Sequence, residues 1–471
     1  MQPSDDPMDV ASAPRNGAVE ERRGGPTRAI VLAPVLGRRP RRAPGEAVET
    51  PVRPVHSPQD RLAEATGLAR AIDLDVRSAI LVPLPSPKPG ALFGSGKVEE
   101  IRALVADEHA ELVIIDHAVS PVQQRNLEKA WSCKVLDRTG LILEIFGRRA
   151  RTREGRLQVE LAHLTYQKSR LVRSWTHLER QRGGAGFLGG PGETQLELDR
   201  RLIQDRIDSI EDELEVVVRT RELHRSGRRR VPYPVAAIVG YTNAGKSTLF
   251  NQVTGAGVDA RDQVFATLDP TMREVRLATG RRIILSDTVG FISDLPTSLV
   301  AAFRATLEEV IEADLVLHVR DISHPERDAQ RADVEHVLTE LGITVSGPDA
   351  HILEVWNKID RLDPMERDEL VNAAARRNEN RPVLISALTG DGIPDLFSEI
   401  DRRLSADDEI VSVLVPAAAG RLAHWLHENT DVIDRNTSDD GSLAYRVRIS
   451  KSKRGRLDGQ LQRAGLAASE G

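Results

Sequence analysis

The sequence predicts an α/β protein built around a doubly wound parallel sheet. An α/β domain with a long helical hairpin precedes this sheet, and a small α+β domain follows it. Three observations predict this class: strand-like segments alternate with helical ones, two heptad-like seams flank a glycine-rich stretch, and several loop motifs follow predicted strand ends. The predicted units are an extension at 1–27, the N-terminal domain at 28–146, the hairpin at 147–230, the main domain at 231–404, the α+β domain at 405–450 and a basic tail at 451–471.

The composition is typical of a multidomain globular protein in a reducing compartment. A chain of 471 residues, 40% of them hydrophobic, has room for about three domains. The single cysteine, Cys133, excludes an internal disulfide and every multi-cysteine metal site, so we expect a cytoplasmic protein. Residues 1–27 read as a disordered extension without the apolar run of a signal peptide. No stretch approaches the roughly 18 apolar residues of a membrane span.

The N-terminal domain is predicted from strand–helix alternation. Strands at 29–32, 79–84 and 112–116 alternate with helical stretches at 58–72 and 98–108, as in a mostly parallel sheet. The turn Gly94-Ser95-Gly96-Lys97 resembles a phosphate cradle. However, no Ser or Thr follows the lysine, which favours a tight structural turn over a second nucleotide site.

Two seams predict the hairpin. The first consists of Leu157, Leu161, Leu164, Lys168, Leu171, Trp175 and Leu178, and the second of Ile203, Ile207, Ile210, Leu214 and Val217. The block at 183–193 between them holds too many glycines, and a proline, to be helical. We therefore expect two antiparallel helices joined at a glycine-rich tip.

Positive charge gathers on this hairpin. A solvated helical surface is the simplest explanation, but arginine so exceeds nearby acid that contact with a phosphate backbone is favoured. Since only 3% of residues are aromatic, we expect structured RNA rather than stacked single strands. The cations are Arg148, Arg149, Arg151, Arg153, Arg156, Lys168, Arg170, Arg173, Arg180 and Arg182 toward the first helix, and Arg219, Arg221, Arg225, Arg228, Arg229 and Arg230 at the end of the second.

The α+β domain is predicted from a strand at 410–415, a helix at 420–427 and a strand at 443–449. The tail from Lys451 is basic and contains glycine. We expect this tail to be loose.

A phosphate-binding loop follows the predicted strand at 235–239 and precedes a helical stretch at 248–253. Its glycines let backbone N–H groups surround phosphate oxygens, and the helix N-terminus adds its dipole. Lys246 is expected to bridge the β and γ phosphates, and the Ser247 hydroxyl to bind Mg²⁺. The loop residues are Gly240, Tyr241, Thr242, Asn243, Ala244, Gly245, Lys246 and Ser247.

Two further segments are expected around the γ-phosphate. After a strand at 282–285 comes Asp287-Thr288-Val289-Gly290, whose aspartate can hold Mg²⁺ through a water and whose glycine N–H can reach the γ-phosphate. Earlier, Phe265-Ala266-Thr267-Leu268-Asp269 supplies Thr267 to close over Mg²⁺, with Thr271 as the fallback. Lys246, Thr267 and Gly290 are the predicted catalytic residues.

The base is expected to be guanine. A strand at 351–356 leads to Asn357-Lys358-Ile359-Asp360, where the Asp360 carboxylate can accept hydrogen bonds from the N1–H and amino group of guanine; adenine has no such donor pair. Another strand ends in Ser386-Ala387-Leu388, which either contacts the base oxygen or is a simple structural turn. The ordered set predicts GTP as the substrate, at the carboxyl ends of the strands.

From about residue 28 to 449 the sequence resembles the HflX family of translational GTPases, in the Obg–HflX branch of the TRAFAC GTPases. Besides the loop motifs, the resemblance rests on blocks at 94–101, 158–161 and 199–201, and most specifically on Gly190-Pro191-Gly192-Glu193-Thr194. It implies binding to the large (50S) ribosomal subunit and its RNA, with dissociation or rescue of stalled ribosomes. It also implies that the hairpin tip reaches toward the peptidyl-transferase region. We expect a monomer when free.

The chain departs from the family pattern at two positions. Ser169 stands where proline is common, which puts a helix cap or kink in doubt, and Arg320 occupies a strand position where a small or apolar residue is expected. The second change should alter local packing without touching the nucleotide contacts.

Hydrolysis lacks one usual component. The residue after Gly290 is Phe291 rather than a water-orienting glutamine, so intrinsic hydrolysis should be slow. A ribosomal component in trans, or K⁺ held partly by Asn243, are the two candidates for completing the site. A GTP-dependent signalling switch that recruits a protein effector without RNA contact is the competing function, and a separate ATPase activity of the N-terminal domain is a third hypothesis.

Overall fold

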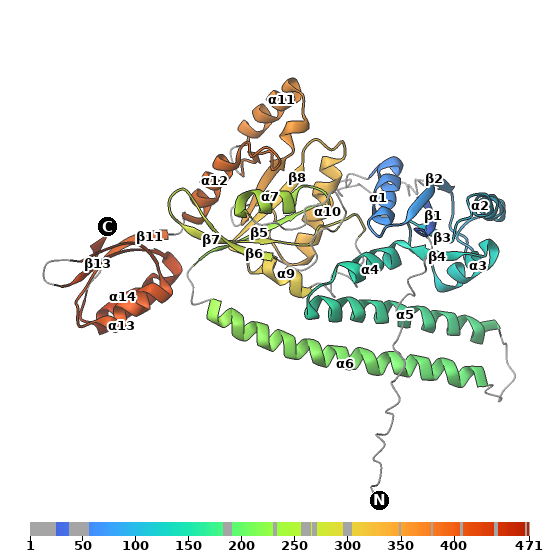
Figure 1. Cartoon of the computed structure of the whole chain (residues 1–471), viewed down its shortest axis with the longest axis horizontal. Helices are drawn as coiled ribbons and strands as arrows, with labels where there is room; N and C mark the ends of the chain where they lie inside the picture. The colour runs from blue at the N-terminus through green and yellow to red at the C-terminus, as the bar shows by residue number, and fades with distance from the viewer. Residues whose placement is uncertain are drawn as a thin grey trace, which may run out of the picture.

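The computed structural model describes three sheets with their helices and one long hairpin (Figure 1). None of the helices in the described segments is long and apolar enough to cross a membrane. The described residues are 25–36, 56–181, 191–228, 233–255, 265, 271–294, 304–347, 350–377, 380–405, 408–437, 441–466 and 469–470.

The N-terminal sheet is parallel throughout, as the alternation predicts. Its strands are β1 (Arg28–Leu36), β2 (Asp75–Leu84), β3 (Leu112–Ile115) and β4 (Lys134–Asp137), in the order β2-β1-β3-β4. Its helices are α1 (Pro58–Arg70), α2 (Ser95–Asp107), α3 (Pro121–Trp131) and α4 (Arg138–Arg149). The carboxyl ends of β3 and β4 carry Asp116 and Asp137, both buried.

The hairpin consists of α5 (Arg153–Gln181) and α6 (Pro191–Arg228), which run antiparallel (Figure 1). Contacts between the two helices bury Leu157, Ile207 and Ile210, three members of the predicted seams. The Ser169 hydroxyl donates to the Tyr166 carbonyl at 2.7 Å and α5 continues past it, so no break occurs there.

One part of the hairpin prediction was wrong. The glycine-rich block was expected to be non-helical through Glu193, but α6 already begins at Pro191. Proline is tolerated in the first helical turn, where its missing N–H would have no helical partner. The tip itself, residues 182–190, lies outside the described residues.

The central sheet has the order β10-β9-β8-β5-β7-β6. Its strands are β5 (Val235–Gly240), β6 (Thr271–Arg276), β7 (Arg282–Asp287), β8 (Leu315–Asp321), β9 (Ile352–Asn357) and β10 (Val383–Leu384). All pairs are parallel except β6 with β7. β5 lies between β8 on one side and β7 on the other, so the order of the strands reverses at β5. In sheets of this kind, ligands bind at the carboxyl ends of the strands next to such a reversal.

Helices cover both faces of this sheet (Figure 1). They are α7 (Lys246–Thr254), α9 (Arg304–Ile311), α10 (Arg327–Glu340), α11 (Pro364–Ala375) and α12 (Ile393–Ser405). Arg320, the unexpected strand residue, is buried and donates to Glu354 on β9 at 2.8 Å and to Asp328 on α10 at 3.0 Å. Its charge is therefore compensated within the domain.

The C-terminal domain is an antiparallel sheet of order β12-β13-β11-β14 with two helices. Its elements are β11 (Asp408–Val415), α13 (Gly420–Asn429), β12 (Asp431–Thr437), β13 (Leu443–Ser450), α14 (Lys451–Arg463) and β14 (Ser469–Glu470). The prediction of a loose basic tail was wrong. Leu457 and Leu461, one helical turn apart, are buried in the core of this domain, and that apolar pair fixes α14 despite its high charge.

Candidate nucleotide site

The predicted phosphate loop connects the end of β5 to the start of α7. Asn243 and Gly245 adopt left-handed backbone conformations, with φ of 60° and 94°. A Cβ on Gly245 would lie 2.2 Å from Asn357 Nδ2, so both the conformation and the close approach require glycine. The Asn357 amide donates to the Ala244 carbonyl at 2.8 Å, which ties this loop to the end of β9.

Lys246 lies buried at the base of this loop. Its ammonium donates to the Tyr241 carbonyl at 2.8 Å. Burial lowers the pKa of Lys246 to about 8; the Asp287 carboxylate opposes the shift, and Lys358 adds to it. A bound polyphosphate would supply the missing negative charge and favour the ammonium form.

The Asp287-to-Gly290 segment lies directly against the loop. The Thr242 N–H donates to the Phe291 carbonyl at 2.7 Å, and the Phe291 N–H donates to the Gly240 carbonyl at 3.1 Å. A Cβ on Gly290 would be 3.0 Å from Lys246 Nζ. The glycine predicted to reach the γ-phosphate is therefore next to the ammonium predicted to bind it.

The two predicted Mg²⁺ residues in the described chain adjoin each other. The Ser247 hydroxyl donates to Asp287 Oδ2 at 2.8 Å, at the junction of α7 and β7. A hydroxyl beside a carboxylate is the kind of oxygen donor set that Mg²⁺ takes near phosphates. Thr288, in contrast, turns inward and donates to the Ile238 carbonyl at 2.6 Å.

The predicted base-binding residues converge from two loops. Asn357 Oδ1 accepts from the Ala387 N–H at 2.9 Å, and Asp360 Oδ1 accepts from the Ser386 hydroxyl at 2.6 Å. Ser386 is fully buried, whereas Leu388 is largely exposed. The Ser386-Ala387-Leu388 turn is therefore hydrogen-bonded to the side chains of both Asn357 and Asp360. Ile359, which lies between these two residues in the sequence, is buried.

Sequence reasoning missed Asp321. It ends β8 and its Oδ2 accepts from the Lys358 ammonium at 2.7 Å, while its Oδ1 accepts from the Ser323 hydroxyl at 2.6 Å. This contact fixes Lys358 across the phosphate loop. The Lys358 Cε lies 4.0 Å from the point that a Cβ on Gly245 would occupy. A polar residue at the carboxyl end of a neighbouring strand was the available signal.

Phe265 is the described member of the segment predicted to close over the nucleotide. It is buried, and its ring packs edge-on against Phe146 of α4 with centroids 4.6 Å apart. Ala266, Thr267, Leu268 and Asp269 lie outside the described residues. Thr271, the fallback, begins β6 and is half-buried.

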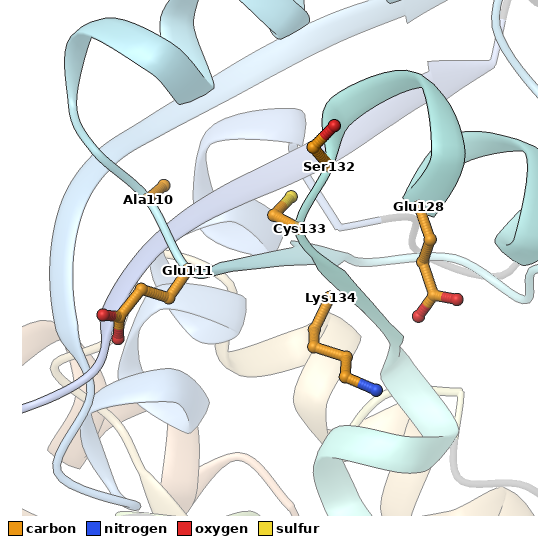
Figure 2. A pocket seen from close by; sticks show the side chains of 6 residues that line it. All are labelled: Ala110, Glu111, Glu128, Ser132, Cys133 and Lys134. Atoms are coloured by element: carbon orange, nitrogen blue, oxygen red, sulfur yellow. The ribbon is translucent and has the colours of Figure 1, made fainter.

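Two other features lie away from this site. Gly94 caps α2 in an extended conformation, and the Lys97 ammonium pairs with Glu100 at 2.5 Å on the surface. A pocket of about 460 Å³ lies at the amino ends of β3 and β4, lined by Glu111, Glu128, Lys134 and others (Figure 2). Burial and the nearby Glu128 raise the pKa of Cys133 in that pocket to about 11, which favours the protonated thiol at neutral pH.

The hairpin cations fall into two groups. Arg170 is mostly buried, pairs with Asp137 at the start of α4 and lies over the Tyr166 ring, so it joins α5 to the N-terminal domain and is not free to bind RNA. This corrects the expectation for Arg170. Arg153 and Arg219 are largely exposed and pair with Glu213 and Glu215 on α6. The side chains of Arg173, Arg180 and Arg182 lie outside the described residues.

Comparison with known proteins agrees with this arrangement. Four family models match in succession: GTP-binding GTPase N-terminal at 59–147, GTP-binding GTPase middle region at 149–228, 50S ribosome-binding GTPase at 235–358 and HflX C-terminal domain at 369–470. The GTPase HflX of Magnetococcus marinus is 48% identical over 408 residues, covering 87% of this chain and 92% of that protein. The chain belongs to the HflX family.

Further HflX relatives agree along most of their length. The GTPase HflX of Escherichia coli is 46% identical over 397 residues, covering 82% of this chain and 89% of that protein. The one from Caldanaerobacter subterraneus is 43% identical over 389 residues, covering 82% and 87%. The chain is therefore an HflX GTPase, a GTP-binding enzyme that hydrolyses GTP, with the doubly wound α/β domain predicted from its sequence.

Proposed function

We propose that this HflX GTPase is cytoplasmic and binds the large (50S) ribosomal subunit through the RNA of that subunit. We propose that it dissociates or rescues stalled ribosomes. The support comes from the middle of the chain. A family model named 50S ribosome-binding GTPase covers the phosphate loop and the Asp287-to-Gly290 segment, and the long α5–α6 hairpin packs through α5 against α3 and α4 of the N-terminal domain (Figure 1). A pair of long helices with exposed arginines suits contact with a phosphate backbone.

The exposed part of the hairpin carries the proposal. Arg153 and Arg219 are 76% and 74% exposed and pair with single carboxylates on the surface. Such pairs contribute at most about 1 kcal/mol, so phosphates can replace the carboxylates at little cost. Arg206, 45% exposed and shared between Glu160 and Glu213, belongs to the same surface.

Co-sedimentation with 50S subunits tests this proposal. The wild-type chain should sediment with the subunits in the presence of a non-hydrolysable GTP analogue and much less with GDP. Charge reversal at Arg153, Arg156 and Arg219 should abolish this sedimentation while nucleotide binding stays unchanged. If sedimentation is unaffected, the competing function, a switch that recruits a protein effector without RNA, takes its place.

We propose the following roles in the site. Lys246 bridges the β and γ phosphates, the Gly290 N–H contacts the γ-phosphate, and Asp360 binds the guanine edge. Ser247 and Thr267 would hold Mg²⁺, and Asp287 would act on it through a water. Mg²⁺, when bound, neutralises charge on the β and γ phosphates.

We propose that a group other than the side chains of the Asp287-to-Phe291 segment activates hydrolysis. Phe291 is buried, with both backbone groups bonded to the phosphate loop, so its side chain cannot orient a water. K⁺ near Asn243, or a ribosomal component, then stabilises the transition-state charge. GTPase rates in K⁺ and in Na⁺, each with and without 50S subunits, distinguish these sources, and equal rates in all four conditions exclude both.

A further inference from the structure

One carboxylate of the N-terminal domain connects two separate segments of the GTPase site. Glu64 extends from α1 into the interface with the nucleotide domain, where its side chain is 14% exposed. Its Oε1 accepts from the Tyr241 hydroxyl at 2.6 Å, and its Oε2 accepts from the Ser293 hydroxyl at 2.6 Å. Tyr241 belongs to the phosphate loop, and Ser293 follows Gly290 by three residues.

The two segments are also joined to each other at this point. The Ser293 N–H donates to the Tyr241 hydroxyl oxygen at 2.8 Å. Arg138, at the start of α4, donates to the Ser293 carbonyl at 2.8 Å and to Glu64 Oε2 at 3.0 Å. Its other nitrogen pairs with the buried Asp116. Every group in this network is therefore held by at least two partners, which restricts it to one geometry.

The charge of Glu64 is stabilised where it lies. Burial opposes ionisation, but the Arg138 guanidinium and the hydrogen bonds from Ser293 and Tyr241 outweigh it and lower the pKa of Glu64. Burial and the neighbouring Glu64 charge raise the pKa of Tyr241 well above its ordinary value, so its hydroxyl remains a donor. At neutral pH, the network consists of a carboxylate that accepts from two hydroxyls and one guanidinium.

This network reaches Gly290, the residue proposed to contact the γ-phosphate. Phe291 bonds to Gly240 and Thr242 on one side, and Ser293 is fixed by Glu64 and Arg138 on the other. Between these anchors and the end of β7, Gly290 lies beside Lys246 Nζ. Gly290 is thus held beside the ammonium that is proposed to bind the γ-phosphate, a group that GDP lacks.

We propose that Glu64 is a positioning residue for the GTPase site, which holds Gly290 over the phosphate loop through Ser293 and Tyr241. Binding of the γ-phosphate depends on this placement, whereas binding of the base and of the α and β phosphates does not. The N-terminal domain is then part of the device that distinguishes GTP from GDP. The inference rests on the proposed contact of Gly290 with the γ-phosphate and is independent of the ribosome proposal.

The Glu64→Gln variant of the full-length chain tests it, because glutamine keeps the volume and removes the charge. Affinities for a non-hydrolysable GTP analogue and for GDP are measured by titration with fluorescent nucleotides. We expect the analogue to bind about 10-fold more weakly and GDP to change by less than about 2-fold, within the range of coupling between sites. The kcat for GTP should fall as well, because Gly290 contacts the reacting phosphate.

Two milder variants make the test independent of folding. Ser293→Ala and Tyr241→Phe each remove one hydroxyl that donates to Glu64. Each should lower the ratio of analogue to GDP affinity in the same direction as Glu64→Gln. In the combined Glu64→Gln and Ser293→Ala variant, the second change should add little, since both remove the same connection.

Asp431→Asn is the matched control. Asp431 begins β12 in the C-terminal domain and, like Glu64, is a mostly buried carboxylate paired with an arginine, Arg448, at 3.2 Å. Its described contacts include neither the phosphate loop nor the Asp287-to-Ser293 segment. It should lower the melting temperature and leave the affinity ratio unchanged. Equal weakening of both nucleotides by Glu64→Gln, no weakening of either, or the same change of ratio in Asp431→Asn would overturn the proposal.

Discussion

The nucleotide site and the α5–α6 hairpin hold their polar groups in opposite ways. In the nucleotide site, hydrogen bonds from the ends of neighbouring strands converge, and Asn357, Ser386 and Asp287 are almost completely buried. Along the hairpin, the described ion pairs within and between α5 and α6 lie on the surface, as that of Arg153 with Glu213 does. Arg170, which pairs with the buried Asp137, is an exception within the hairpin.

This difference indicates where each region gains its specificity. Buried, convergent groups discriminate one ligand from another, because an unmatched group loses its hydrogen bonds without water to replace them. Surface charges attract phosphate with little regard to its carrier. Substitutions should therefore have large and ligand-specific effects in the first region, and small and salt-dependent effects in the second.

The largest expected effect is at Lys246. Lys246→Ala removes the buried ammonium next to Gly290, and we expect GTP and GDP affinity to fall by about 1,000-fold, the equivalent of roughly 4 kcal/mol for a charged contact to two phosphates. Isothermal titration calorimetry with GDP measures this. Retention of full affinity would mean that the phosphates bind elsewhere and would remove the contrast between the two regions.

The comparison is sharpened inside the hairpin by Arg170→Ala. The substitution leaves Asp137, buried at the start of α4, without its guanidinium partner. Breaking a buried pair is expected to destabilise the N-terminal domain by about 3 kcal/mol. Urea unfolding followed by circular dichroism measures this loss. A change no larger than that of an exposed arginine would show that Arg170 belongs with the surface charges.

A pH dependence is expected where the N-terminal domain meets α10. Burial opposes the charge on His56, but hydrogen bonds to Asp333 and Glu326 outweigh it and raise the pKa to about 9. Because the folded pKa exceeds the unfolded value of 6.5, the stabilisation is complete below pH 6.5 and is lost as the pH rises through about 9. Asp60 and His324 also lie close to this cluster.

The melting temperature should therefore fall between pH 6.5 and pH 9 more steeply in the wild type than in His56→Gln. We expect the difference to correspond to about 2 kcal/mol. Differential scanning calorimetry at a series of pH values makes the comparison. Parallel curves for the two proteins would show that His56 carries no charge in the interface.

The smallest effect is expected at Arg153. Its pair with Glu213 is on the surface, so Arg153→Ala should change the free energy of unfolding by less than about 1 kcal/mol. The same variant should weaken co-sedimentation with 50S subunits, and the weakening should be reduced at high salt. A large loss of stability would place Arg153 with Arg170.

The sequence predicted the nucleotide site better than the surfaces around it. Glycines, a lysine and an aspartate at fixed positions after strands are dictated by local backbone geometry, so Gly245, Lys246, Asp287 and Asn357 lie together as expected. The prediction of a loose tail failed because the high charge of this segment concealed the apolar pair Leu457 and Leu461.

Long-range contacts account for the remaining differences. Glu64 and Arg138 contact residues of the nucleotide domain far along the chain, and nothing in a helix sequence indicates such partners. Arg170 was grouped with its exposed neighbours because its partner, Asp137, comes from another element. Asp321 alone carried a usable signal, its place at the end of a buried strand.

The central claim is that the Asp360 carboxylate selects guanine, and an Asp360→Asn variant tests it most directly. Guanine offers two donors to a carboxylate, whereas xanthine offers a carbonyl in place of the amino group and suits an amide. In competition titrations, wild type should prefer GDP to both ADP and xanthosine diphosphate, and Asp360→Asn should prefer xanthosine diphosphate. Equal affinity of the wild type for GDP and ADP, or an unchanged preference in the variant, would contradict the account.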